Sequence, residues 1–439
     1  ITLSPSTTTP LYRVPAAGGE PEPFTTIDTT QGFNSHRWPA LLPGGRAAAF
    51  TEFGGGLDDA FIAVADLETG AITRLSLRGL RPQWAPSGHL VYGTADGSIV
   101  AVPFDPAKRE VTGAPVSLLE GVMVRVSILA EFAVSQAGHL IYLSGEAPDL
   151  SLALVDSVGI EEILVEDLRE PEGPRASPDG RRIALAQIDA GHTDIWVYDR
   201  RERTMTRMTF EGNNRYPVWS PDGTRIAFSH SPDRSPRRAI WWVAADGSGT
   251  PQELFDGEGD EWEVAWLPNG RDLVVRSISG TSTSRDLWWI PAEGEAVPFV
   301  ATEFNERSAA VSPDGRWVAY GSNESGRDEV YVRPLPGPGG KRQVSAEGGS
   351  EPLWSRDGRM LFYRGPDRRF YSVEVRTAPT LAIGQRRPLF EDRYGANTSH
   401  TNYDLLPDGR FVALKGSNDQ TNVVLVLNWV QELKQRVRN

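Results

Sequence analysis

The sequence predicts an all-β fold, a single closed β-propeller, and three observations support this class. A short turn sequence of the type Ser-Pro-Asp-Gly recurs along the chain, its spacing is nearly constant, and β-rich segments flank each copy. Glycine and proline are also frequent, with 44 and 33 residues, which favours many turns over long helices. We therefore expect four-stranded antiparallel blades around a central channel.

The turn is clearest in residues 215–230, "RYPVWSPDGTRIAFSH". Pro221 presets φ for the bend, Asp222 tolerates the bend, and Gly223 accepts a positive φ. The segments on either side are rich in β-branched and aromatic residues, which favour strands. This stretch therefore predicts a strand, a tight turn and a second strand.

The same turn recurs nine times, and successive turn glycines lie 42 to 51 residues apart. A period of about 40–45 residues with strands throughout is typical of propeller blades. The turn glycines are Gly45, Gly88, Gly138, Gly180, Gly223, Gly270, Gly315, Gly358 and Gly409.

Each repeat also has the same internal order. In the repeat of Gly315, an apolar strand follows the turn at residues 316–320, and a polar loop leads to a third strand at 329–332. A more polar fourth strand follows at 342–344. Together with the strand before the turn, this order gives the four strands of one propeller blade.

We expect nine blades in a single ring, with eight blades as the alternative. Residues 1–28 resemble the third and fourth strands of a blade, and the last repeat, residues 402–427, supplies the first two strands. Strands from both termini would then complete one blade and leave no open sheet edge. On this interpretation residues 1–439 form one domain, with blades over 29–427 and a short C-terminal helix over 428–439.

Composition excludes several functional classes. The net charge of −13 repels nucleic-acid phosphates, so nucleic acid is not an expected partner. The chain has no cysteine, which excludes disulfides, thiolate metal sites and cysteine nucleophiles and suits either the cytoplasm or a bacterial envelope. No window approaches 18 apolar residues, so we expect no membrane insertion by this chain. The first residues lack the basic and apolar regions of a signal peptide.

The repeat pattern P-x-W-S-P-D-G-x-x-I-A-F followed by D-I-W-V-Y-D resembles the TolB-like β-propeller repeat. Three stretches resemble more narrowly the C-terminal propeller of bacterial membrane-bound serine/threonine protein kinases. They are "LYRVPAAGGEPEPFTT" at 11–26, "FEGNNRYPVWSPDG" at 210–223 and "LNWVQEL" at 427–433. In that family, a cytoplasmic kinase domain and a transmembrane helix precede a propeller outside the membrane.

This resemblance implies a non-catalytic sensor or interaction module on the extracytoplasmic side of a bacterial membrane. The chain itself contains no kinase motif, neither the Gly-rich loop nor H-R-D nor D-F-G. The implied partner is an unknown protein or a small polar ligand, and no cofactor is expected. The cytoplasm remains an alternative location.

Motifs for other chemistry are missing from the sequence. A serine hydrolase would need a G-x-S-x-G elbow, and none occurs. EF-hand loops, P-loops and HExxH are likewise absent. The alternative is a propeller enzyme, a lyase or glycoside hydrolase, that uses polar residues at the channel mouth.

Candidate ligand-binding residues precede the turn glycines, where the innermost strands are expected to begin. Histidines lie nine residues before the glycine, arginines eight and glutamates seven. Because side chains alternate along a strand, only one of the last two registers should face the channel. The candidates are His36, Arg37, Arg215, Glu263, Arg307, Glu351 and His400.

These residues have two interpretations. The arginines could hold a polar, partly anionic molecule, and the two histidines, which become neighbours when the ring closes, could bind a metal or an anion. Alternatively, all of them are solvated charges at the rim. Backbone geometry explains the turns at the opposite end, so we expect any ligand or partner at the end that carries the candidate residues.

Overall fold

The computed structural model contains two compact units. Unit 1 comprises Ile1–Pro148 and Asn418–Asn439, and unit 2 comprises Asp149–Asp233 and Arg237–Ser417. Among the described residues, no helix is long and apolar enough to cross a membrane. The structure describes residues 1–4, 9–33, 35–54, 59–125, 129–145, 150–189, 192–232, 237–278, 285–337, 339–377, 380–395, 400–416 and 422–436.

Unit 2 consists of six four-stranded antiparallel sheets, which confirms the predicted propeller class. Five sheets use four strands that are consecutive in the chain. They are β19–β22 (Glu172–Ala176, Arg182–Asp189, His192–Asp199, Thr204–Arg207), β23–β26 (Asn213–Trp219, Arg225–Ser231, Ala239–Ala244, Gln252–Phe255), β27–β30 (Asp260–Trp266, Leu273–Ile278, Asp286–Ile290, Val297–Val300), β31–β34 (Glu306–Val311, Trp317–Ser322, Glu329–Pro334, Arg342–Gln343) and β35–β38 (Ser350–Trp354, Met360–Arg364, Arg369–Arg376, Ala382–Glu391).

The recurrent turn is held by its own side chains. Ser220 Oγ donates to Asp222 Oδ1 at 2.6 Å and accepts from the Arg225 amide at 3.0 Å, and Gly223 has φ 71°. The same Ser–Asp bond forms in three other repeats, at Ser177, Ser312 and Ser355. The motif therefore recurs because it satisfies backbone donors in a tight bend.

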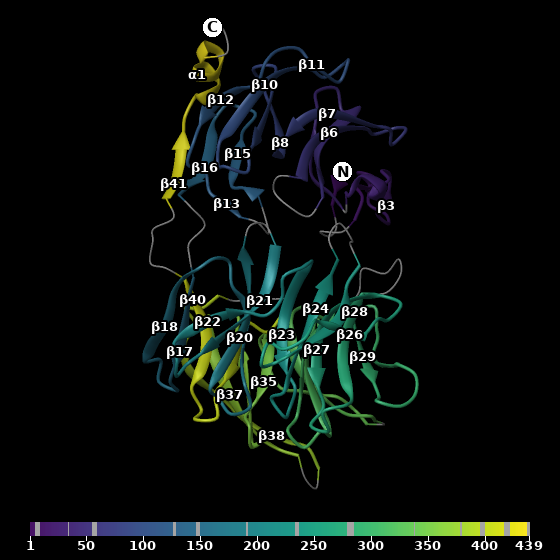
Figure 1. Ribbon diagram of the computed structural model, residues 1–439. Coiled ribbons are helices and arrows are strands. Elements are labelled where there is room, and N and C mark those ends of the chain that lie inside the picture. Colours follow the sequence, from purple (N-terminus) through teal and green to yellow (C-terminus); the bar gives the residue numbers. More distant parts are fainter. Residues whose placement is uncertain are drawn as a thin grey trace. The chain divides into compact units, whose positions relative to one another are not determined.

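The sixth sheet of unit 2 combines strands from distant parts of the chain. Its order is β39 (Tyr403–Leu405), β40 (Phe411–Gly416), β17 (Leu150–Val155) and β18 (Glu161–Leu168). Ala413 of β40 lies opposite Ala153 of β17. In Figure 1 the yellow β40 accordingly lies beside the dark teal β17.

The six sheets contact one another in a circle. The innermost strands β39, β19, β23, β27, β31 and β35 meet in that order, and the Tyr403 hydroxyl donates to the Glu351 carbonyl at 2.8 Å, which joins the last sheet to the first. Two of these junctions repeat an indole bond, from Trp219 to the Arg175 carbonyl and from Trp354 to the Ala310 carbonyl. Unit 2 is thus a six-bladed propeller.

Unit 1 contains the three remaining turn-bearing sheets. The first is β4–β7 (Ser35–Leu41, Ala47–Phe53, Ala60–Asp66, Ile72–Arg78), and the second is β8–β12 (Leu80–Ala85, His89–Gly93, Ile99–Asp105, Glu110–Val111, Val116–Leu119). The third joins β15 (Phe132–Val134) and β16 (Leu140–Ser144) to β41 (Asn422–Val426). Short strands β13 (Val124–Arg125) and β14 (Leu129–Ala130) pair with each other.

Nine sheets therefore carry the nine turns, but they are divided between two units of three and six. The sequence predicts a single ring of nine or eight blades, whereas the six blades of unit 2 close among themselves. The reason is an exchange of third strands. The repeat of Gly138 contributes β17 and β18 to β40, and the repeat of Gly409 contributes β41 to β16.

The prediction that residues 1–28 close the ring with the last repeat is wrong. β1 (Thr2–Leu3), β2 (Tyr12–Arg13) and β3 (Glu22–Pro23) form a sheet of their own. A short 3₁₀ helix, η1 (Thr29–Gln31), leads from this sheet to β4. Leu11 is fully buried in a cluster with Phe50 of β5. The edge of β40 that these residues were expected to cover is occupied by β17.

The predicted C-terminal helix is present as α1 (Trp429–Arg436) in unit 1, and residues 437–439 lie outside the described part. Trp429, Val430 and Leu433 are buried against the sheets of β8–β12 and β15–β16. The Val430 amide donates to the Gly138 carbonyl at 3.1 Å. The helix therefore covers the apolar face of the third sheet of unit 1.

Deleting residues 1–28 should destabilise unit 1 alone. The deletion exposes Phe50 and removes Thr25, which hydrogen-bonds the buried His36 side chain at 2.9 Å. Hydrogen exchange should then show lower protection of β4–β6 and unchanged protection of β39 and β40. Loss of protection in β39 and β40 would instead support the closing role predicted from the sequence.

Candidate functional site at the mouth of the unit 2 channel

A cavity of about 400 Å³ follows the axis of unit 2. Residues of all six innermost strands line it, including Arg175, Val218, Ala265, Ala310 and Asp404. One end is formed by residues of the Ser-Pro-Asp-Gly turns. We call the other end, where the innermost strands begin, the mouth; it is lined by Tyr216, Glu263, Arg276, Ser308 and Thr401.

The innermost strands share a bulge at the mouth. The pairing register shifts after Arg215 and after Arg307, and the next residues, Tyr216 and Ser308, have φ of 57° and 53°. Such a bulge re-aims side chains and interrupts the simple alternation of a strand. Glu263 lines the cavity, and it belongs to the register seven residues before the turn glycine.

Glu263, Arg276 and His400 form the centre of the mouth. Glu263 Oε2 lies 3.3 Å from Arg276 Nε, and Glu263 Oε1 lies 3.5 Å from His400 Nδ1. Arg276 Nη2 lies 3.2 Å from the same His400 nitrogen, which accepts this bond when the imidazole is neutral. Glu263 also accepts from the Ser308 amide of the next sheet at 3.2 Å.

The electrostatics of this group fix its charge states at neutral pH. Burial opposes ionisation of Glu263, but the Arg276 charge and His400 outweigh it and lower the pKa of Glu263 to about 2. Burial lowers the pKa of His400 to about 4 against the pull of Glu263. Glu263 is therefore an anion and His400 a neutral imidazole at pH 7.

Three rings lie together beside this ion pair. Tyr216 stacks on His400 with centroids 3.8 Å apart, and Trp262 lies 6.2 Å from the same ring at an angle of 19°. Tyr216 is buried, and burial raises the pKa of its hydroxyl. The Tyr216 ring lines the cavity together with Glu263 and Arg276.

Four further arginines belong to strands or loops at this end of unit 2. Arg215 Nη1 donates to Glu172 Oε1 at 2.7 Å, and Arg307 forms an ion pair with Asp328. Arg238 and Arg285, which sequence reasoning missed, form no ion pair within the part of the chain that the structure describes. Arg238 lies 4.6 Å from the centroid of Trp262.

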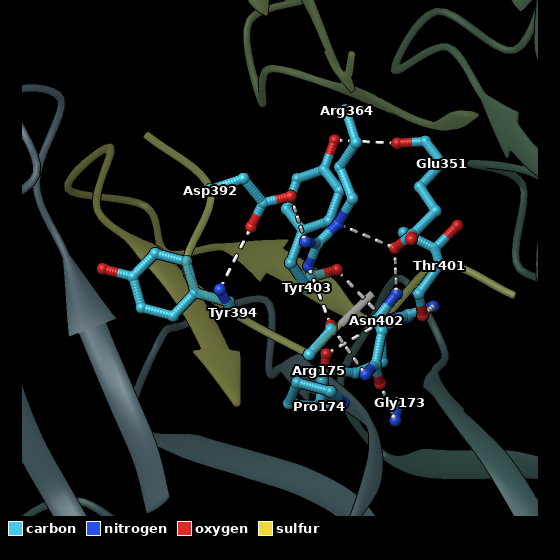
Figure 2. A network of polar contacts seen from close by, with 11 residues as sticks. Gly173, Pro174, Arg175, Glu351, Arg364, Asp392, Tyr394, Thr401, Asn402 and Tyr403 are labelled. Carbon is cyan, nitrogen blue, oxygen red and sulfur yellow. Dashed lines mark hydrogen bonds and ion pairs between the residues drawn. The ribbon is translucent and has the colours of Figure 1, made fainter. Parts of the chain in front are cut away.

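Glu351 belongs to a different network, where the propeller closes (Figure 2). Its carboxylate lies 3.2 Å from Arg364 Nε and accepts from the Asn402 amide at 2.6 Å. Asn402 Oδ1 in turn accepts from the Gly173 amide at 2.7 Å. With 1% exposure, Glu351 connects three sheets and has little surface for a ligand.

His36 and Arg37 lie in unit 1, on β4. His36 is fully buried, bonds Thr25 through Nδ1, and has its pKa lowered to about 4 by burial and by the Arg74 charge. Arg37 lies over the Phe53 ring at 4.0 Å. The prediction that His36 and His400 become neighbours depends on the first and last repeats completing one ring. This ring does not form, because β40 of the last repeat pairs with β17 in unit 2.

Two buried carboxyls lie at the same register as His400. Glu261 and Glu306 are 1% and 0% exposed, and burial raises the pKa of each to about 7. Serine hydroxyls face them, Ser277 toward Glu261 and Ser322 toward Glu306. Among the described residues, no group of three or more His, Asp or Glu side chains is placed to hold a metal ion.

The spacing of glutamate and arginine in the sequence indicates the two buried Glu–Arg ion pairs. Glu263 and Arg276 are 13 residues apart, as are Glu351 and Arg364, and each pair spans one turn with its members on adjacent strands. Arg238 and Arg285 likewise each lie 15 residues after a turn glycine. A comparison of registers on both sides of the turn would have found these partners.

Comparison with known proteins supports a TolB-like propeller. No protein-family model matches the chain. The Tol-Pal system protein TolB of Anaeromyxobacter dehalogenans is 32% identical over 91 residues, which are 21% of this chain and 20% of that protein. An uncharacterized protein of Agrobacterium fabrum is 26% identical over 190 residues, 41% of this chain and 59% of that protein. The chain thus spans about a fifth of the length of the TolB relatives it matches.

Solved structures with similar folds include two TolB proteins. The putative TolB from Agrobacterium tumefaciens has a TM-score of 0.49 and 16% identity and covers 62% of this chain and 99% of its own. TolB from Acinetobacter baumannii has a TM-score of 0.35 and 16% identity and covers 79% of this chain and 67% of its own.

Replacing Glu263 by Gln should destabilise the protein at neutral pH by about 3–5 kcal/mol, because the 2%-exposed Arg276 loses its anionic partner. A carboxyl with a lowered pKa stabilises the fold above its ordinary pKa, and this contribution is lost as pH falls toward 2. The difference between wild type and variant in denaturant unfolding should therefore shrink between pH 5 and 2.

Glu293→Gln is the matched control, since that side chain is 88% exposed. It should change the free energy of unfolding by less than about 0.5 kcal/mol. Equal, small effects of the two substitutions, or a difference that persists at pH 2, would contradict the role assigned to Glu263.

Proposed function

We propose that the chain is a non-catalytic interaction module that recognises a partner protein or a small polar ligand at the mouth of unit 2. The supporting observation is the concentration of charged and aromatic side chains at this end of the channel. The opposite end is built from Ser-Pro-Asp-Gly turns, and backbone geometry accounts for their composition. At the mouth, Tyr216, Glu263 and Arg276 line the cavity, and Arg276 lies 5.8 Å from the centroid of the Trp262 ring.

We further propose that this module works on the extracytoplasmic side of a bacterial membrane as part of a receptor-type serine/threonine kinase. The support is the resemblance of residues 11–26, 210–223 and 427–433 to the propellers of such kinases, together with the similarity to the TolB protein over 91 residues. A kinase domain and an apolar span encoded ahead of Ile1 would agree with this context, and a different upstream domain would contradict it.

The test of the binding role is a pair of double variants that remove equal charge from the two ends of the channel. Arg215→Ala with Arg307→Ala alters the mouth. Arg181→Ala with Arg359→Ala alters exposed arginines that directly follow turn glycines, with side chains 80% and 84% exposed. A partner is first captured from bacterial envelope extract with the wild-type chain, identified by mass spectrometry and purified.

Affinity for the purified partner should fall at least tenfold in the mouth variant and stay within twofold of wild type in the turn variant. The mouth variant is expected to melt at a lower temperature, because the part-buried Arg215 and Arg307 each leave a carboxylate partner unpaired. Binding is therefore measured well below the melting temperature of both variants, so that folded proteins are compared. A partner lost from the turn variant and retained by the mouth variant would place recognition at the other end.

A further inference from the structure

A ring of six side chains surrounds the middle of the unit 2 cavity. These residues lie five positions before the turn glycines, one on each innermost strand. Each is part-exposed, and on five of the six strands the residues directly before and after it are buried. The ring therefore faces the cavity, and all of its members line it: Arg175, Val218, Ala265, Ala310, Leu353 and Asp404.

The ring has a charged side and an aliphatic side. Arg175 belongs to β19 and Asp404 to β39, and these two strands are neighbours in the circle of sheets. The other four positions, on β23, β27, β31 and β35, carry only valine, alanine and leucine. A molecule at this level of the cavity therefore meets two opposite charges on one side and hydrocarbon on the other.

Main-chain carbonyls hold the Arg175 guanidinium in place (Figure 2). Its Nη1 donates to the Pro174 carbonyl at 3.0 Å and to the Tyr403 carbonyl at 3.1 Å. Its Nη2 donates to the Thr401 carbonyl at 2.8 Å. A guanidinium has five N–H donors, so these three bonds fix its orientation and leave donors for an external carboxylate.

Main-chain amides hold the Asp404 carboxylate in the same way. Its Oδ2 accepts from the Ala176 amide at 2.8 Å, and its Oδ1 accepts from the Leu405 amide at 2.8 Å. Asp404 thus bonds the residue after Arg175, and Arg175 bonds the residue before Asp404. These crossed bonds place both charges at the same junction of two sheets.

The two charges are not neutralised by other side chains. No ion pair of Arg175 or Asp404 is found within the part of the chain that the structure describes. The other charged residues of the cavity lining are engaged elsewhere. Glu263 lies 3.3 Å from Arg276 at the mouth, and the exposed Arg356 donates to two main-chain carbonyls at the turn end.

A ligand with a single charge fits this ring poorly. An anion on Arg175 is repelled by the neighbouring Asp404 carboxylate, and a cation on Asp404 is repelled by the Arg175 guanidinium. A molecule that carries both a carboxylate and an ammonium group satisfies the two side chains together through charge-assisted hydrogen bonds. The aliphatic side of the ring favours an apolar body on the same molecule.

We propose that the cavity of unit 2 binds a small aliphatic amino acid, with its carboxylate on Arg175 and its ammonium group on Asp404. Its side chain lies against the aliphatic side of the ring. The inference rests on the proposed recognition role of unit 2 and names the class of small ligand. The cavity of about 400 Å³ is within the range of small-molecule sites, about 300–1,000 Å³.

The experiment compares three ligands that share one aliphatic body, using the whole purified chain without any partner protein. Leucine carries both charges, 4-methylpentanoate only the carboxylate and leucinamide only the ammonium group. Calorimetry at pH 7 and low ionic strength should give a dissociation constant below about 1 mM for leucine. Each analogue should bind at least tenfold more weakly, measured by chemical-shift titration, because each leaves one charge of the ring without its partner.

Two substitutions should each affect a different group of the ligand. Asp404→Asn should weaken leucine at least tenfold and keep 4-methylpentanoate within threefold of its wild-type affinity. Arg175→Lys loses the planar donor geometry and should weaken leucine and 4-methylpentanoate but not leucinamide. Asp179→Asn with Arg181→Gln is the matched control in the same sheet, since these side chains are 54% and 80% exposed. It should leave all three affinities unchanged.

Ala310→Leu tests the aliphatic side without altering either charge, and it decides the matter if the two charge variants do not fold. The larger side chain fills part of the cavity and should weaken leucine at least tenfold. An unchanged affinity of this variant would contradict the proposed position of the ligand.

Absence of leucine binding, or equal affinity for leucine and either analogue, would overturn the proposal. Loss of all three ligands together in folded Asp404→Asn or Arg175→Lys would do the same, because the two side chains would then act only on the junction of the sheets. If partner binding still depends on Arg215 and Arg307 while leucine does not bind, the recognition role stands and the amino-acid site is rejected.

Discussion

The pairing of β40 with β17 determines the arrangement of the other strands. Without it, β39 and β40 would end as a two-stranded edge, and the five consecutive sheets of unit 2 would form an open arc. The pairing supplies a third and a fourth strand and brings Asn402 between Glu351 and Gly173, where three sheets are joined by hydrogen bonds. A closed circle of sheets leaves as edges only the outer strand of each blade and creates the axial cavity whose mouth we assign to recognition.

The two Glu–Arg pairs show how one local pattern serves two purposes. Glu351 and Arg364 have a second carboxylate, Asp392, with its Oδ2 2.5 Å from Arg364 Nη1, and the group is sealed at the closure. Glu263 and Arg276 have instead the neutral His400 and the cavity. A buried ion pair alone contributes little net stability. At the closure the added bonds offset the desolvation, whereas at the mouth Glu263 contacts His400 and accepts a hydrogen bond from the Ser308 amide.

The sequence predicts the features that depend on residues within one repeat, but it does not predict the pairing of strands from distant repeats. The Ser-Asp bond within each turn, the strand on either side and the four-strand repeat all follow from residues within one period, and all are present. The repeat pattern does not determine which third strand pairs with which second strand, because β17 and β41 are both apolar strands of similar length. For the same reason, the sequence predicts that His36 and His400, each nine residues before a turn glycine, are neighbours. In the structure they belong to different units. Arg238 and Arg285 were missed because they come after the turn, in loops of variable length.

Strand exchange is the central claim, and cysteine cross-linking measures it most directly because the chain has no cysteine of its own. The pairs Ala153→Cys with Ala413→Cys and Ile141→Cys with Leu425→Cys join residues that lie opposite each other across the exchanged pairings. Both pairs should form a disulfide under mild oxidation, seen as a shift in a non-reducing gel and confirmed by peptide mass. The pair Ala413→Cys with Leu425→Cys, which a local hairpin of β40 and β41 would bring together, should remain reduced. Rapid oxidation of this last pair, with none in the first two, would contradict the exchange and the six-bladed unit built on it.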